Sequence, residues 1–186
     1  MKQDRILNIP NVLTLGRILI TPFIIYAIIE HQAVLALILM AVAGITDMLD
    51  GAIARYFNQR STVGAYLDPM ADKLLLISTI VTLYAIDQIP LFLFLAVIFR
   101  DVIIVLGAIA YEMVTHKLKI QPSIASKITT FLQITLVLTV LSDMAWQIPG
   151  DGILQISIWL TFAFTCISGI QYMVVWMLKA IADEGR

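Results

Sequence analysis

Apolar residues run through this chain in six long stretches, which short polar segments separate. The stretches cover residues 12–30, 33–56, 65–86, 90–113, 125–145 and 153–178. A helix needs about 20 residues to cross the hydrocarbon core of a bilayer. The pattern therefore predicts an all-α integral membrane protein with six transmembrane helices, in which residues 1–186 form a single membrane domain.

The composition supports membrane insertion. Apolar residues make up 60% of the 186 residues, charged residues make up 13%, and the mean hydropathy is +0.94. A soluble domain is roughly 25% charged, so this chain carries about half of the usual charge. The net charge of −1 indicates no nucleic-acid partner, and the positions of the charges therefore carry the functional information.

The basic residues divide the polar breaks into two groups. The breaks at Glu30–Gln32, Asp87–Pro90 and Asp143–Gly152 contain no Lys or Arg. The basic residues of the other two breaks and of both ends are Lys2, Arg5, Arg60, Lys117, Lys119, Lys179 and Arg186. Because basic loops favour the cytoplasmic side, both termini are predicted to be cytoplasmic. With no recognisable signal peptide or mitochondrial extension before the first stretch, the predicted location is the bacterial plasma (inner) membrane.

Four aspartates interrupt the apolar pattern. Asp47 and Asp50 share a helix face at i and i+3 near the end of the second stretch, and Asp68 and Asp72 share one at i and i+4 near the start of the third. Carboxylates inside a bilayer cost at least a few kcal/mol each and mark functional sites. Oxygen ligands suit two divalent cations, Mg²⁺ or Mn²⁺, which commonly clamp a transferring phosphoryl group. The predicted site faces the cytoplasm.

The residues around the aspartates suit a phosphate-containing ligand. Gly51 and Ala54 leave space on the helix face, and Arg55 offers a fork for phosphate oxygens. Gly64 permits a close approach of the backbone. Taken singly, Gly51 and Ala54 are also typical helix-packing residues, and Arg55 is also a typical cytoplasmic anchor. Their combination with four aspartates favours a nucleotide or diphosphate site.

The spacing resembles the signature of the CDP-alcohol phosphotransferase family, D-x2-D-G-x2-A-R-x8-G-x3-D-x3-D. The eight fixed positions are Asp47, Asp50, Gly51, Ala54, Arg55, Gly64, Asp68 and Asp72. The resemblance implies transfer of a phosphatidyl or similar group from a CDP-linked donor to an alcohol, with release of CMP. It implies that Asp47, Asp50 and Asp68 bind metal, and that Asp72 contacts metal and takes the proton of the acceptor hydroxyl. It also implies that Gly51, Ala54 and Arg55 surround the CDP group, and that the protein is a homodimer.

The acceptor alcohol is predicted from the other polar residues inside apolar stretches. Arg100 and Asp101 lie near the middle of the fourth stretch, and Ser126 and Lys127 lie at the start of the fifth. Arg100 and Asp101 suit an internal ion pair as well as a substrate contact. Lys127 suits an interfacial anchor as well as a ligand contact. Together, these residues are candidates for a basic pocket that binds an anionic acceptor.

Two branches of the resembled family compete for this chain. Residues 8–17 resemble the opening of the branch that makes anionic glycerophospholipids. Phosphatidylglycerophosphate synthases, whose acceptor is glycerol 3-phosphate, typically carry Arg-Glu and a further arginine where this chain has Asp101 and Ala108. CMP-forming cardiolipin synthases, whose acceptor is phosphatidylglycerol, show Arg-Asp and a Pro-Ser/Thr-x-x-Ser-Lys-x-x-Thr pattern, which residues 122–130 reproduce. The resemblance favours phosphatidylglycerol as acceptor and CDP-diacylglycerol as donor.

Intramembrane acids are also typical of cation and proton transporters. Here the aspartates cluster near one membrane face, the outer halves of the second and third stretches carry no charge, and no inverted repeat is recognisable. A catalytically silent scaffold would not need the complete acidic motif. Both alternatives are therefore disfavoured relative to an enzyme.

Overall fold

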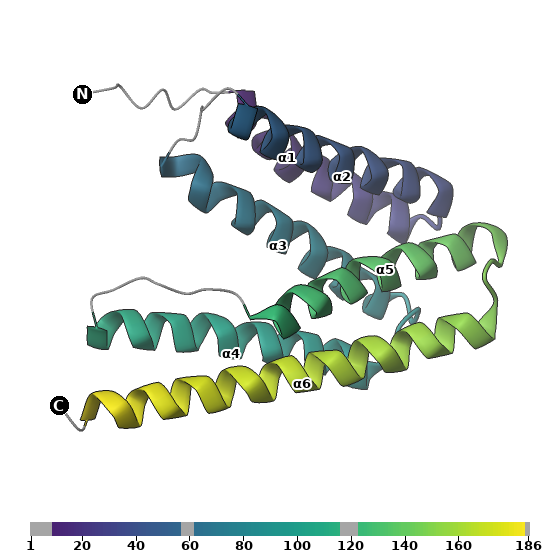
Figure 1. The fold of residues 1–186 in the computed structure, drawn as a ribbon. Coiled ribbons are helices and arrows are strands. Elements are labelled where there is room, and N and C mark those ends of the chain that lie inside the picture. The colour runs from purple at the N-terminus through teal and green to yellow at the C-terminus, as the bar shows by residue number, and fades with distance from the viewer. Residues whose placement is uncertain (1–8, 57–61, 116–122, 185–186) are drawn as a thin grey trace. The chain divides into compact units, whose positions relative to one another are not determined.

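In a computed structural model of the chain, residues 9–56, 62–115 and 123–184 are described. Side chains within these ranges are described except for residues 9–10, 48, 50–56, 62–66, 108, 110–115 and 176–184. Every regular element in the described ranges is an α-helix. The helices are α1 (Ile9–Ile29), α2 (Ala33–Tyr56), α3 (Thr62–Ala85), α4 (Leu91–Thr115), α5 (Ile124–Trp146) and α6 (Asp151–Glu184) (Figure 1). The predicted all-α fold is confirmed, and each helix overlaps one predicted stretch.

At two of the predicted breaks, a residue in the left-handed backbone conformation ends the preceding helix. His31 has a φ of 55°, its N–H donates to the carbonyl of Ile28, and the N–H of Gln32 donates to the carbonyl of Ala27 at 2.8 Å. These two bonds form a Schellman motif, which satisfies carbonyls at the end of α1. Asp87, with a φ of 59°, ends α3 in the same way. Because these bonds are local, a short polar break is sufficient to stop a helix.

Hydroxyl groups within the helices bond to their own backbone. Thr79 donates to the carbonyl of Leu75 at 2.8 Å, and Thr165 donates to the carbonyl of Thr161 at 2.7 Å. Each bond joins a side chain to the carbonyl four residues earlier. Because each hydroxyl bonds to its own helix, these polar residues can lie in an apolar environment without a hydrogen-bond partner on another helix.

The described surface is apolar. Large hydrophobic side chains are exposed on all six described helices, for example Phe23 on α1, Phe131 on α5 and Ile156 on α6. Within the described residues, three helical segments have the length and composition of membrane spans: Asn11–Ile29, Ile124–Trp146 and Asp151–Val175. Soluble monomers rarely expose continuous apolar surface on this scale. The chain is an integral membrane protein.

The chain divides into two compact units. The first comprises Met1–Gln88 with Val140–Ile148, and the second comprises Ile89–Thr139 with Pro149–Arg186. In the first unit, α1 packs against both α2 and α3 (Figure 1). Buried alanines, including Ala36 on α2 and Ala71 on α3, allow the helices of the first unit to approach closely. α1 is therefore the element that joins the two aspartate-bearing helices.

In the second unit, α4 packs along α6 (Figure 1). Phe92 of α4 stacks on Trp159 of α6, with ring centroids 5.0 Å apart. Phe92 also meets the edge of Phe162 at 5.1 Å. Such aromatic pairs stabilise a contact by about 0.5–1.5 kcal/mol beyond the burial of their area. The aromatic cluster fixes the pairing of α4 and α6, which positions the buried polar residues described below.

Candidate active site

α1 carries a buried polar stripe. Asn11, Thr14, Arg17 and Thr21 recur every three or four residues, so they lie on one helix face, and all four are buried. A buried arginine in an apolar helix requires partners of opposite charge. The partners of this stripe lie on α2 and α3.

Three of the predicted aspartates converge on α1. The Nη2 atom of Arg17 lies 2.8 Å from the Oδ1 atom of Asp47 on α2. The Nη1 atom of the same guanidinium donates to Asp72 on α3, and the hydroxyl of Thr14 donates to Asp68 on α3. We call Thr14, Arg17, Asp47, Asp68 and Asp72 the Arg17 cluster. It ties both aspartate-bearing helices to α1.

The Arg17 cluster is closed on one side and open on the other. The side chain of Arg17 is 1% exposed, whereas those of Asp47 and Asp72 are 44% and 50% exposed. Each contact uses the Oδ1 oxygen of its carboxylate. The guanidinium therefore lies at the base of the cluster, and half-exposed carboxylate oxygens remain accessible above it.

The structure brings together the predicted residues Asp47, Asp68 and Asp72. The predicted residues Asp50, Gly51, Ala54 and Arg55 lie on α2, and Gly64 lies on α3, but the side-chain positions of this second group are outside the described part of the chain. Among the residues whose side chains are described, no group of three or more His, Cys, Asp or Glu residues is arranged to hold a metal ion. Arg17 offsets part of the negative charge of Asp47 and Asp72.

The sequence analysis did not assign roles to Thr14 and Arg17. The signal was the three- and four-residue spacing of polar side chains along a span that is otherwise apolar. Such a stripe marks the face that meets other helices, and a charged member of it calls for a buried partner.

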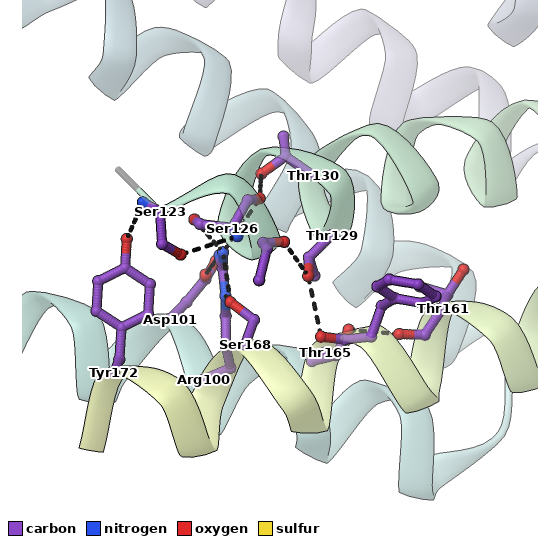
Figure 2. A network of polar contacts seen from close by, with 12 residues as sticks. Arg100, Asp101, Ser123, Ser126, Thr129, Thr130, Thr161, Thr165, Ser168 and Tyr172 are labelled. Carbon is purple, nitrogen blue, oxygen red and sulfur yellow. Dashed lines mark hydrogen bonds and ion pairs between the residues drawn. The ribbon is translucent and has the colours of Figure 1, made fainter. Parts of the chain in front are cut away.

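A second buried arginine lies in the other compact unit. The Nη1 atom of Arg100 lies 2.6 Å from the Oδ1 atom of Asp101, and its Nη2 atom donates to the Oγ atom of Ser126 on α5 at 2.5 Å (Figure 2). The Nε and Nη2 atoms also lie 3.4 Å from the Oγ atom of Ser168 on α6. We call these four residues the Arg100 cluster. All four are buried, and together they join α4, α5 and α6.

Polar contacts continue from the Arg100 cluster along α5 and α6. The Oγ atom of Ser123 accepts a bond from the N–H of Ser126 at 3.1 Å, which caps the start of α5 (Figure 2). The hydroxyl of Tyr172 on α6 accepts a longer bond, 3.4 Å, from the N–H of Ser123. Farther along, Thr129 donates to the carbonyl of Phe164 at 3.0 Å. These contacts form a polar seam between the two helices.

The predicted acceptor residues differ in their burial and contacts. Arg100 and Ser126 come together, whereas Lys127 is exposed on α5. The internal ion pair between Arg100 and Asp101 is present. Because Asp101 neutralises Arg100, the Arg100 cluster holds little net positive charge.

The described helices of this membrane protein bring three aspartates of the signature together on α1. Residues 7–167 match the family described as CDP-alcohol phosphatidyltransferase, and the chain belongs to this family. The family predicted from the eight-position signature is confirmed.

Curated relatives fall into two groups. A probable cardiolipin synthase (CMP-forming) from Drosophila melanogaster is 35% identical over 93% of this chain, and the human cardiolipin synthase (CMP-forming) is 36% identical over 85%. The alignments cover only 59% and 58% of these two relatives, so the chain spans less than two thirds of their length. A CDP-diacylglycerol--glycerol-3-phosphate 3-phosphatidyltransferase from Aquifex aeolicus is 30% identical, with 92% of this chain and 93% of the relative aligned.

Proposed function

We infer that this chain transfers a phosphatidyl group from CDP-diacylglycerol to a glycerol-based acceptor and releases CMP. The observation that carries this proposal is the convergence of Asp47, Asp68 and Asp72, residues of the family signature, on one open-sided cluster. The names of both groups of relatives agree with a CDP-linked donor and a glycerol-based acceptor.

In the proposed reaction, Asp72 accepts the proton of the acceptor hydroxyl as the oxygen attacks the phosphorus of the phosphatidyl group. The bond to CMP then breaks, and CMP leaves with the electron pair. The half-exposed position of Asp72 suits a base that must reach a substrate. Gly51, Ala54, Arg55 and Gly64 would surround the CDP group.

Two divalent cations, Mg²⁺ or Mn²⁺, would be held by Asp47, Asp50, Asp68 and Asp72. The donor set fits because hard carboxylate oxygens are the ligands that these ions prefer, and the carboxylates are open on one side. When bound, the cations would neutralise the diphosphate charge. Excess chelator is expected to abolish CMP release, and full activity in chelator would refute the metal requirement.

The acceptor is proposed to be phosphatidylglycerol, which would make the protein a CMP-forming cardiolipin synthase. Arg100, Ser126 and Lys127 are the proposed acceptor-binding residues. Because Asp101 neutralises Arg100, the Arg100 cluster suits a single phosphodiester charge better than the two charges of glycerol 3-phosphate.

Glycerol 3-phosphate is the second candidate acceptor. It is favoured by one observation, the alignment over nearly the full length of the transferase from Aquifex aeolicus. The deciding experiment measures CMP release by the purified full chain with CDP-diacylglycerol, Mg²⁺ or Mn²⁺, and each acceptor separately. Release with phosphatidylglycerol alone would support the first candidate, and release with glycerol 3-phosphate alone would replace it with the second.

The proposed topology has six transmembrane helices, with both termini and the acidic site on the cytoplasmic side. The absence of Lys and Arg from three of the five predicted breaks supports it. The inner membrane of a bacterium is the proposed location, and relatives from Aquifex aeolicus and Rickettsia felis agree with it. A homodimer is proposed from the family resemblance.

Asp50→Asn separates the enzyme from the other classes of function. It is expected to abolish CMP release because a proposed metal ligand is lost. A cation or proton transporter would instead show altered ion flux, and a scaffold would show neither change. CMP release and ion flux are measured on the same reconstituted preparation, with wild-type protein as the reference.

A further inference from the structure

We propose that Arg17 is the built-in counter-ion of the acidic site, holding Asp47 and Asp72 in place without metal and lowering the affinity of the site for divalent cations. This inference rests on the proposed metal-dependent function. It concerns a residue outside the eight-position signature.

Arg17 is suited to this role by its shape. Its two terminal nitrogens contact carboxylates from two different helices, Asp47 on α2 and Asp72 on α3. A guanidinium presents such donors in a fixed plane, whereas a lysine ammonium is a single point of charge. One side chain on α1 therefore prevents the two carboxylates from repelling each other and separating α2 from α3.

Burial places Arg17 opposite the accessible side of the cluster. The guanidinium is almost completely buried, and the two carboxylates that it contacts are about half exposed. A cation from solvent must therefore approach the carboxylates from the side away from Arg17. Arg17 can remain in place as a cation approaches, and its charge then opposes the incoming charge.

The electrostatic effect has a definite sign. A unit positive charge about 5 Å from a divalent cation, at an effective dielectric constant between those of protein and water, weakens cation binding by more than about tenfold. Removal of the Arg17 charge should therefore strengthen cation binding. The same removal should destabilise the metal-free protein, because Asp47 and Asp72 lose their shared partner.

The test compares wild-type protein with Arg17→Gln in detergent or nanodiscs. Mn²⁺ affinity is measured by titration calorimetry, and the unfolding temperature is measured in chelator and in saturating Mn²⁺. The variant is expected to bind Mn²⁺ more than about tenfold more tightly and to unfold at a lower temperature in chelator. Saturating Mn²⁺ should raise its unfolding temperature by more than it raises that of wild type. A merely structural role would lower stability without strengthening Mn²⁺ binding.

Arg100→Gln is the matched control, because Arg100 is also a buried arginine paired with aspartate. Combined with Asp101→Asn, which leaves the net charge of the Arg100 cluster unchanged, it should destabilise the protein with no change in Mn²⁺ affinity. Arg17→Lys keeps the charge but loses the fork, so it should lower stability in chelator and leave Mn²⁺ affinity within about threefold of wild type. If Arg17→Gln does not fold in either condition, equal stability of wild type and Arg17→Lys in chelator would overturn the proposal.

The outcomes separate this inference from the proposed function. Mn²⁺ binding by wild type with unchanged or weaker affinity in Arg17→Gln would overturn the role of Arg17 and leave the enzyme proposal standing. No Mn²⁺ binding by wild type would overturn both the role of Arg17 and the metal site.

Discussion

The two buried arginines of this protein make similar ion pairs in different surroundings. Arg17 bridges carboxylates from two other helices that are about half exposed, whereas Arg100 pairs with its buried sequence neighbour Asp101 and with serine hydroxyls. The first arrangement leaves carboxylate oxygens accessible to a ligand. The second satisfies its charges internally. Exposure of the acidic partner, rather than presence of an ion pair, distinguishes the cluster proposed for catalysis from the cluster proposed to bind the acceptor.

The same substitution in each cluster gives the sharpest contrast. Asp72→Asn is expected to lower the rate of CMP release by about 10²–10⁴-fold, because the proposed base is lost. Its loss of stability should be modest, since Asp72 is half exposed and Arg17 keeps Asp47 as a partner. Asp101→Asn should lower the unfolding temperature more than Asp72→Asn does, and it should lower the rate of CMP release less. Normal activity of Asp72→Asn would contradict the base assignment.

Arg100→Gln tests the structural side of the comparison. Removal of the guanidinium leaves the carboxylate of Asp101 buried without its charged partner. Loss of one partner of a buried ion pair typically costs about 3–5 kcal/mol of unfolding free energy. Denaturant titration of the purified protein measures this loss. The double variant Arg100→Gln with Asp101→Asn should recover part of it, and no recovery would show that the ion pair is not the source.

Ser126→Ala and Ser168→Ala compare the two serine contacts within the Arg100 cluster. The hydroxyl of Ser126 accepts a bond from Arg100 at 2.5 Å, whereas that of Ser168 lies 3.4 Å from the same side chain. A hydrogen bond to a charged group is worth about 1.5–3 kcal/mol, so Ser126→Ala should be the more destabilising of the two serine-to-alanine variants. Parallel unfolding curves measure the difference. Equal losses would show that the two distances do not reflect unequal bonds.

Gln133→Leu is expected to have the smallest effect, and it should raise stability where the other variants lower it. Gln133 on α5 is buried, and its Nε2 atom has no hydrogen-bond partner among the residues that the structure describes. An apolar side chain of similar volume removes an unsatisfied donor, so stability should rise by about 1 kcal/mol. The unfolding temperature measures the change. A loss of stability would show that the amide has a partner in the folded membrane protein.

Local signals predicted the helices but not their partners. The breaks at Glu30–Gln32 and Asp87–Pro90 were predictable because polar residues interrupt the apolar pattern there, and the backbone at each break bonds to the preceding turn. The grouping of Asp68 with Asp72 was predictable from helical spacing alone. The contact of Arg17 with Asp72 joins residues 55 positions apart, and it depends on which helices become neighbours. Periodicity within one helix marks a buried polar face, but it does not identify the side chain that meets it.

The wide sequence separation between Arg17 and Asp72 has a consequence for biosynthesis. α1 is made before α3, and the ribosome must add 55 residues after Arg17 before Asp72 exists. At about 5–20 residues per second, this takes roughly 3–11 seconds. During that interval the guanidinium of α1 must be hydrated at the bilayer surface or bear the cost of insertion. Asp47 on α2 is made earlier and can pair with Arg17 first, so the Arg17 cluster is complete only after α3 has been made.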